Sequence, residues 1–166
     1  MLVFCLAQEV VYNCGGTNGV YQTDLGELTP ETTLTAQSQM AVGTNASGGF
    51  SIITYGTSMA AGTNVIPGLE EPTLSQVGTN QFGINLVENT EPAVGIDPEG
   101  EWANALPNPD YSQPDHYKFV SGDMVAYSPN VSLMKKFTVS YIVNASRSLR
   151  PGVYSTTVNF IATGRF

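Results

Sequence analysis

The chain has 166 residues and a mass of 17.7 kDa, which is the size of one ordinary domain with room for a hydrophobic core. Only 12% of its residues are charged, about half the usual ~25%, and the abundance of Gly, Pro, Thr, Ser and Asn favours strands and turns over helices. The net charge is −8 with six Lys and Arg residues, so binding to nucleic acid through phosphate contacts is excluded. No stretch approaches the ~18 apolar residues of a transmembrane helix, and no membrane span is predicted.

The N-terminal segment, residues 1–14, contains a run that is apolar on both faces of an extended chain. Leu2–Ala7 has no polar residue, whereas a sandwich strand should keep one polar face. One interpretation is the remnant of an export signal, although the run is shorter than the ~7–15 residues of an h-region and follows no positive charge. The other is a strand that inserts into a neighbouring subunit and supplies main-chain hydrogen bonds. This assembly strand would use Leu2, Val3, Phe4, Leu6, Val10 and Tyr12.

Two cysteines, Cys5 and Cys14, flank the end of this run. In one straight strand their Cα atoms would lie about 30 Å apart, far beyond the ~7 Å limit of a disulfide. A bond within the chain needs a reversal, and residues 8–11 contain no Gly or Pro to signal one. The sequence therefore predicts separate thiols or a disulfide between subunits. No zinc site is predicted, because the spacing matches no zinc motif and His116 is the only histidine.

Alternation of apolar and polar residues with period two is the dominant pattern in the rest of the chain. It is clearest in residues 32–42 and 137–143, and no window shows a helical period. Residues 45–49, with the sequence Asn-Ala-Ser-Gly-Gly, are predicted to form a hairpin link between two strands. The predicted strands are residues 2–12, 20–28, 32–42, 49–55, 82–87, 117–120, 124–127, 137–143 and 154–162.

A long irregular stretch, about residues 88–116, contains five prolines, the only Trp and the only His. Loops of this length are usually functional or disordered. We see no domain boundary there, because a short sheet on either side could not bury its own face. The sequence predicts an all-β fold: a single antiparallel β-sandwich, jelly-roll or Ig-like, over residues 15–166, with residues 1–14 as an N-terminal strand that is donated to a neighbour.

Enzymatic chemistry finds little support in the sequence. A nucleophilic triad is not predicted, since His116 is the only imidazole and no Gly-x-Ser-x-Gly elbow is present. Paired carboxylates for a glycosidase could come from Asp97, Glu99 and Glu101 or from Asp110 and Asp115, and the first three could offer oxygen ligands to Ca²⁺. A solvated acidic loop is the favoured interpretation of these residues. We predict neither an enzyme nor a cofactor, with calcium as the one metal to consider.

Three aromatic residues in or beside the long loop, Trp102, Tyr111 and Tyr117, could form a platform for a sugar ring. The alternative is that they attach the loop to the sandwich. A glycan is thus the small ligand that the sequence suggests.

Positive charge is confined to the C-terminal part of the chain. Residues 1–117 sum to −13 and residues 118–166 to +5, which together give −8. The simple interpretation is that basic C-terminal strands pair with acidic segments inside one fold; the other is that opposite ends of subunits attract each other. Low charge, abundant Thr and Asn, and three sequons, at Asn45, Asn130 and Asn144, favour an exported protein whose signal has been removed.

Four stretches resemble uncharacterised secreted β-rich proteins of candidate-phyla bacteria: residues 81–90, 117–123, 137–144 and 151–158. The resemblance covers about residues 25–166 and extends more loosely to WxL and spore-coat-U-like surface domains. The Trp-x-Leu motif is missing here, which puts cell-wall binding of the WxL kind in doubt. The resemblance implies an extracellular or envelope β-sandwich and offers no catalytic residues to transfer.

From these features we expect a non-enzymatic extracellular or cell-surface protein. The leading hypothesis is a subunit of a pilus-like filament or surface layer, a homopolymer assembled by β-strand donation. The alternative is a monomeric carbohydrate-binding or adhesin module.

Overall fold

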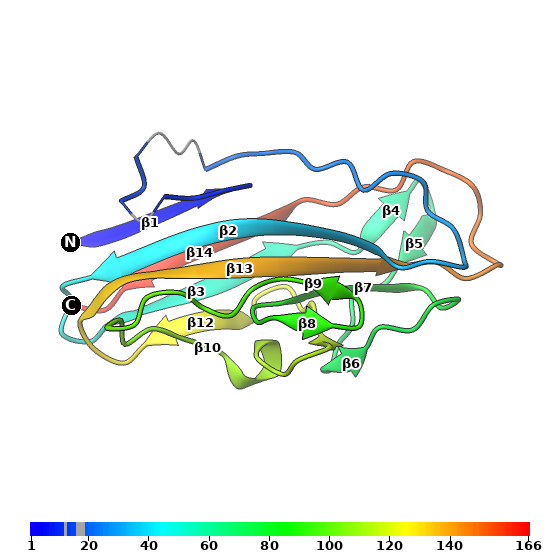
Figure 1. Ribbon diagram of the computed structural model, residues 1–166. Helices are drawn as coiled ribbons and strands as arrows, with labels where there is room; N and C mark the ends of the chain where they lie inside the picture. The colour runs from blue at the N-terminus through cyan, green and yellow to red at the C-terminus, as the bar shows by residue number, and fades with distance from the viewer. Residues whose placement is uncertain (12, 16–18) are drawn as a thin grey trace.

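Strands account for the regular structure of the computed structural model (Figure 1), which describes residues 1–11, 13–15 and 19–166. The all-β prediction is confirmed: the described residues contain no α-helix and one short 3₁₀ turn at Pro109–Tyr111. The strands are β1 (Leu2–Ala7), β2 (Leu34–Thr44), β3 (Phe50–Gly56), β4 (Met59–Ala61), β5 (Asn64–Ile66), β6 (Thr73–Leu74), β7 (Gln81–Asn85), β8 (Asn89–Thr90), β9 (Ala93–Val94), β10 (Leu106–Pro107), β11 (His116–Tyr117), β12 (Met124–Ser128), β13 (Ser132–Asn144) and β14 (Val158–Gly164).

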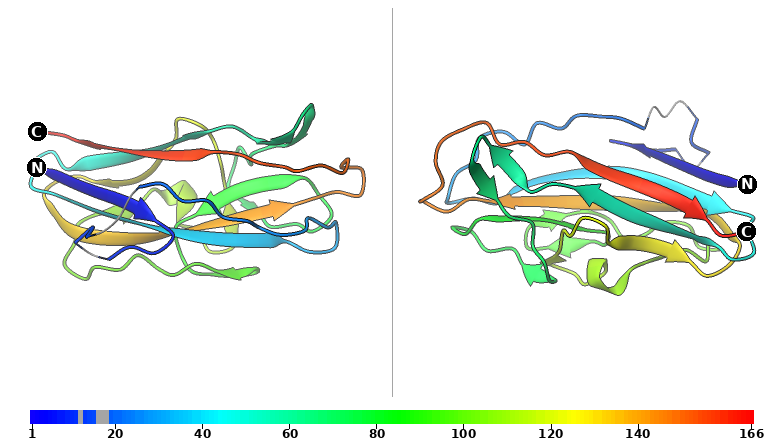
Figure 2. Two further views of the ribbon diagram at one scale, coloured as in Figure 1. Left: turned by 90° about the horizontal axis from the view of Figure 1, so that it is seen from above. Right: turned by 180° about the vertical axis from the view of Figure 1, so that it is seen from behind.

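Two four-stranded antiparallel sheets form the sandwich. The first has the strand order β1-β2-β13-β7 and the second the order β10-β12-β3-β14. The described residues also form three two-stranded ladders outside these sheets: β11-β6, β4-β5 and β8-β9. Both termini lie at the same end of the elongated molecule (Figure 2). The order of strands is mostly non-sequential, so residues far apart in the chain hold the sheets together.

The core lies between the two sheets because each strand turns its apolar alternate residues inward. In β3, Phe50 and Ile52 are fully buried, while Tyr55 on the opposite face is exposed. Phe137 and Val139 of β13 meet them from the first sheet, in one continuous hydrophobic cluster. The period-two pattern of the sequence is therefore the direct cause of the two-layer arrangement.

The strand β13 is buried on both faces. Its outward residues, Thr138 and Ser140, lie under the first half of the long loop, where Gly95 approaches Ser140 so closely that a Cβ on Gly95 would stand 2.2 Å from its hydroxyl oxygen. Further along, Glu99 and Lys136 exchange two backbone hydrogen bonds of 2.9 and 2.8 Å. The long loop, residues 88–116, thus covers the outer face of the first sheet, and we call it the cover loop.

Several predicted elements differ from the structure. Residues 20–28 form no strand, because Asp24 accepts a hydrogen bond from the backbone of Gly26 (φ +83°) in a tight turn. Residues 45–49 make no hairpin: β2 and β3 belong to different sheets, and this link crosses between them. In place of the predicted strand 117–120, only His116–Tyr117 forms one. The last strand starts at Val158, since Ser155 pairs with Ala60 instead.

Positive and negative segments meet inside the one fold, as the simple interpretation of the charge distribution expects. Lys118 contacts Asp110 and Asp123 at 2.8 Å each, Lys136 contacts Glu99 at 2.6 Å, and Arg147 lies 3.6 Å from Glu31. Three of the six basic residues are therefore paired with acids.

Candidate functional site

The strand β1 closes one side of the sandwich as an edge strand. All six of its residues pair antiparallel with β2, from Leu2 opposite Thr44 to Ala7 opposite Gln39. Leu2, Phe4 and Leu6 turn inward and pack against the main core. Cys5 and Ala7 turn outward into a second small cluster around Val10 and Ala41, with Cys14 and Met134 at its border. Both faces of β1 are covered by its own chain, which accounts for the absence of a polar face in the sequence.

The two cysteines form a disulfide within the chain, with their Cα atoms 5.6 Å apart. The expectation that no reversal lies between them is wrong. The chain bends after Ala7, and a turn follows in which the backbone nitrogen of Cys14 donates to the carbonyl of Val11 at 3.0 Å. Cys14 itself has φ +59°, a conformation that the sequence does not signal at a cysteine.

The loop closed by this disulfide packs against the outer face of β2. The backbone nitrogen of Val10 donates to the side chain of Gln39 at 2.9 Å, and Val10 is buried against Ala41. Residues 1–11, 13 and 14 thus hold β2 along its edge and on its outer face; we call them the N-terminal clasp. Tyr12, the remaining residue assigned to the assembly strand, lies outside the described residues.

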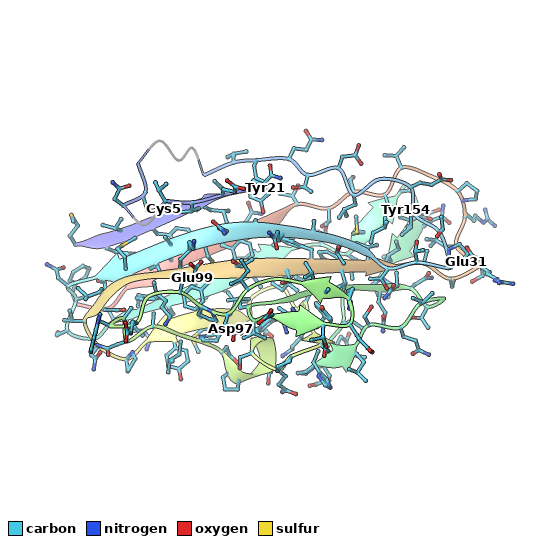
Figure 3. All side chains as sticks on the ribbon, viewed as in Figure 1. Cys5, Tyr21, Glu31, Asp97, Glu99 and Tyr154 are labelled. Carbon is cyan, nitrogen blue, oxygen red and sulfur yellow. A yellow bond between two sulfur atoms is a disulfide. The ribbon has the colours of Figure 1, made fainter. Side chains whose placement is uncertain are left out.

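Residues 19–33 form a segment without helix or strand that leads to β2. Figure 1 shows it running along the molecule, and Leu25 and Leu28 pack against the main core on the way. The hydroxyl groups of Tyr21, labelled in Figure 3, and of Tyr141 on β13 lie 3.2 Å apart, which attaches the segment to the first sheet. Burial, with the neighbouring Tyr21 adding to its effect, raises the pKa of Tyr141 well above its ordinary value, so the Tyr141 hydroxyl stays protonated.

The predicted sugar platform is not present. Tyr111 and Tyr117 have no exposed surface, and both belong to the interior of the fold. The Tyr111 hydroxyl donates a hydrogen bond to Asp123 at 3.0 Å. Trp102, in contrast, is 78% exposed in the cover loop. The alternative, attachment of the loop, holds for the two tyrosines and not for Trp102. One exposed aromatic ring remains where the prediction needs three.

The acidic residues considered for calcium do not converge. Asp97 accepts a hydrogen bond from the backbone of Glu88 at 3.0 Å, and Glu99 is ion-paired with Lys136 (Figure 3). Glu101 is exposed in the following turn. Among the described residues no group of three or more His, Cys, Asp or Glu side chains is placed to hold a metal ion.

Asp115, one of the paired carboxylates considered from the sequence, holds the turn between β8 and β9. Its carboxylate accepts from the backbones of Thr90 and Glu91 at 2.6 and 2.8 Å and from the Thr90 hydroxyl at 2.8 Å. The hydrogen bond from the Glu91 backbone is the main reason that the pKa of Asp115 lies below its usual 3.8, with the Thr90 bonds adding to it.

This geometry predicts an acid-dependent contribution to stability. A depressed pKa in the folded state stabilises the fold above the unfolded value of about 4, and the contribution is lost as pH falls through the folded pKa. Asp115→Asn should therefore cost about 1 kcal/mol at pH 7 and progressively less below pH 4. Urea unfolding of both proteins at pH 7 and in acid measures the difference. An equal loss at every pH would contradict this role of the carboxylate.

Lys118 occupies the most concentrated group of charges in the structure. Its ammonium lies 2.8 Å from both Asp110 and Asp123, and 5.7 Å from the centre of the Tyr111 ring. Burial acts to lower the pKa of Lys118, but the hydrogen bonds to the two carboxylates raise it overall, so the amine is charged in the resting protein. No sequence motif marks this cluster, because its members come together only through the fold.

Two depressions lie on the surface of the described part of the chain. One, of about 220 Å³, is lined by residues that include Gly56, Gly68 and Phe119, and the other, of about 280 Å³, by residues that include Thr33, Val77 and Pro92. Both are open to solvent. Within the described part of the chain, no helix is long and apolar enough to cross a membrane.

Comparison with known proteins adds no relative. No family model matches the chain, and neither a curated protein nor a solved structure is found to match it. What can be said of function therefore comes from the clasp and the surfaces described above.

Proposed function

We propose that the protein is an extracellular structural subunit that assembles with copies of itself by exchanging its N-terminal clasp. The observation that carries this proposal is the position of β1: an edge strand, paired over its whole length with β2 and apolar on both faces. The site that holds β1 can equally receive the same strand from a second copy, since every contact would be repeated between chains.

The connection to β2 is long enough for such an exchange. Residues 15–33 separate the disulfide-closed loop from the start of β2, and 19 residues span roughly 60 Å when extended at about 3.3 Å each. Within this connection the described residues contain no strand or helix that must be unfolded first. The clasp could move as a unit, because the disulfide keeps its loop attached to β1.

An extracellular location is supported by the disulfide and by composition. Disulfides persist in oxidising compartments, and a cytoplasmic protein would keep Cys5 and Cys14 as thiols. A charged fraction of 12% limits the repulsion between packed copies. The glycan-binding alternative has lost two of its three aromatic contacts, because Tyr111 and Tyr117 are buried.

A cysteine trap tests the exchange directly. Leu2 and Thr44 lie opposite each other on β1 and β2, so the double substitution Leu2→Cys, Thr44→Cys should form a disulfide wherever the strands pair. If subunits exchange clasps, a non-reducing gel of the concentrated protein shows a ladder of covalent multimers that collapses to monomer on reduction. A cross-link confined to single chains at every concentration would refute the proposal.

Two controls keep the result interpretable. Each single substitution, Leu2→Cys or Thr44→Cys, should give no ladder, because its partner sulfur is missing. Negative-stain electron microscopy of the unmodified protein should show filaments or sheets, and the same chain without residues 1–14 should show single particles. Filaments from both proteins would place the assembly contact elsewhere and contradict the role of the clasp.

A further inference from the structure

The cluster around Lys118 has the composition of a site that can form an amide between side chains. It combines one amine, two carboxyl groups within hydrogen-bond distance of that amine, and a buried phenol that donates to one of the carboxyl groups. We propose that Lys118 and Asp110 condense to an isopeptide bond, with Asp123 as the group that transfers the proton. This bond is independent of the proposed exchange of the clasp.

The three side chains are held by fixed backbone. Lys118 exchanges two backbone hydrogen bonds with Ile84 on the edge of β7, at 3.0 and 3.1 Å. Asp110 lies in the 3₁₀ turn, where its backbone nitrogen donates to the side chain of Asn108 at 3.1 Å. The carbonyl of Asp123 accepts from Thr54 of β3 at 2.9 Å. Reacting groups held in this way gain the advantage of an intramolecular reaction.

Burial separates this lysine from an ordinary surface ion pair. Lys118 is 8% exposed, and the Tyr111 ring beside its ammonium is fully buried. An amine at hydrogen-bond distance from a carboxyl oxygen stands only slightly farther from the carboxyl carbon than the ~3–3.5 Å of a near-attack pair. Limited access of water on the lysine side favours condensation over hydrolysis.

The roles of the two carboxyl groups follow from their partners. Asp123 accepts from both the Tyr111 hydroxyl and Lys118 through the same oxygen, so it is oriented and lies next to the proton that must move. Tyr111 stays protonated, because burial and then its bond to Asp123 raise its pKa far above the ordinary value. Asp110 contacts the amine and is the more exposed carboxyl group, which gives the departing water a path to solvent.

The step balances without any other reactant. Asp123 takes one proton from the Lys118 ammonium, and the free amine attacks the carboxyl carbon of Asp110 in its protonated form. The new C–N bond forms as the C–OH bond breaks. The proton held by Asp123 leaves with the hydroxyl as water, and the second amine proton passes to solvent to balance the one that protonated Asp110. The products are one secondary amide, one water molecule and the regenerated Asp123 carboxylate.

Intact-mass spectrometry of the purified full-length protein decides the question, because one condensation removes about 18 Da beyond the two hydrogens lost to the disulfide. After reduction, digestion with a protease that cuts between Asp110 and Lys118 should yield one peptide pair joined through these two residues. Lys136 and Glu99, an ion pair of 2.6 Å, provide the internal comparison and should remain unlinked. A mass without this loss, with a free Lys118 in the digest, would overturn the proposal.

Substitutions assign the roles. Asp110→Asn should still react but lose ammonia, so its mass falls by about 17 Da instead of 18. Lys118→Arg and Asp123→Asn should show no loss. If Asp110→Asn still loses 18 Da, Asp123 is the acceptor and the assignment of Asp110 is refuted. The masses are read on denatured protein, so the bond formed in the wild type is detected whatever the stability of each variant.

Discussion

Asn85→Leu should be among the most destabilising single substitutions in the protein. Asn85 is fully buried on β7, and its side chain makes four hydrogen bonds. Its amide nitrogen donates to the carbonyls of Gln113 and His116 at 2.8 Å each, and its oxygen accepts from the backbone of Val87 at 2.8 Å and from Asn89 at 3.2 Å. Leucine would leave the buried backbone nitrogen of Val87 without a partner and would remove one bond each from Asn89 and from the carbonyls of Gln113 and His116.

A buried group left without a partner costs about 1–3 kcal/mol and the three other lost bonds add to this, so we expect a loss of roughly 4 kcal/mol in the free energy of unfolding. For a domain of this size that corresponds to a fall in Tm of about 10–15 °C. Asn159→Leu is the matched control, because Asn159 is exposed on β14 and should change stability by less than about 0.5 kcal/mol. Equal losses from both substitutions would contradict the role of the Asn85 network.

Gly49→Ala should have a comparable effect for a different reason. Gly49 lies in the crossing link between β2 and β3 with φ +75°, and a Cβ there would stand 1.9 Å from the carbonyl oxygen of Ser128. The same atom would lie 2.8 Å from the backbone nitrogen of Asn130. Because these neighbours are backbone atoms, the link must move away from β12, and the C-terminal strand moves with it through the bonds between Arg165 and residues 48–49.

Gly122→Ala separates this clash from backbone strain. Gly122 has φ +97°, and no atom lies within 4 Å of where its Cβ would be. Its substitution should cost only the ~1–2 kcal/mol of a positive φ, whereas Gly49→Ala should cost about 3 kcal/mol or more. Urea unfolding curves of the two variants measure the difference. If Gly49→Ala is no worse than Gly122→Ala, the close approach to Ser128 is not a constraint.

The sequence predicts the strands of the two-layer fold correctly where a segment has one apolar and one polar face. Residues 32–42 and 137–143 are such cases, and β2 and β13 occupy these positions. Prediction fails where a segment is shaped by partners distant in the chain. Residues 20–28 alternate like a strand but have no neighbouring strand with which to form a ladder. The stretch 88–116 covers the first sheet because Gly95 and Glu99 contact β13.

The candidate sites show the same division. That residues 2–7 form an apolar strand is readable from their composition, but the partner that covers them, β2 of the same chain, is not. The sequence does not signal the disulfide, because the turn before Cys14 uses no Gly or Pro. Nor does it show the burial of Tyr111 and Tyr117, which depends on strands elsewhere in the chain. Lys118 and its two aspartates carry no motif by which they could be found.

The position of β13 between β2 and β7 has a consequence for the time course of folding. Neither pairing can form until residues 132–144 are available, and β14 must then reach back to β3, about a hundred residues earlier. Contacts this distant in sequence make folding slow, and neither sheet of a growing chain is complete without the last quarter of the sequence. A polypeptide whose sheets close only after its C-terminal part has been made could pass through a membrane channel before it folds, as the proposed extracellular location would require.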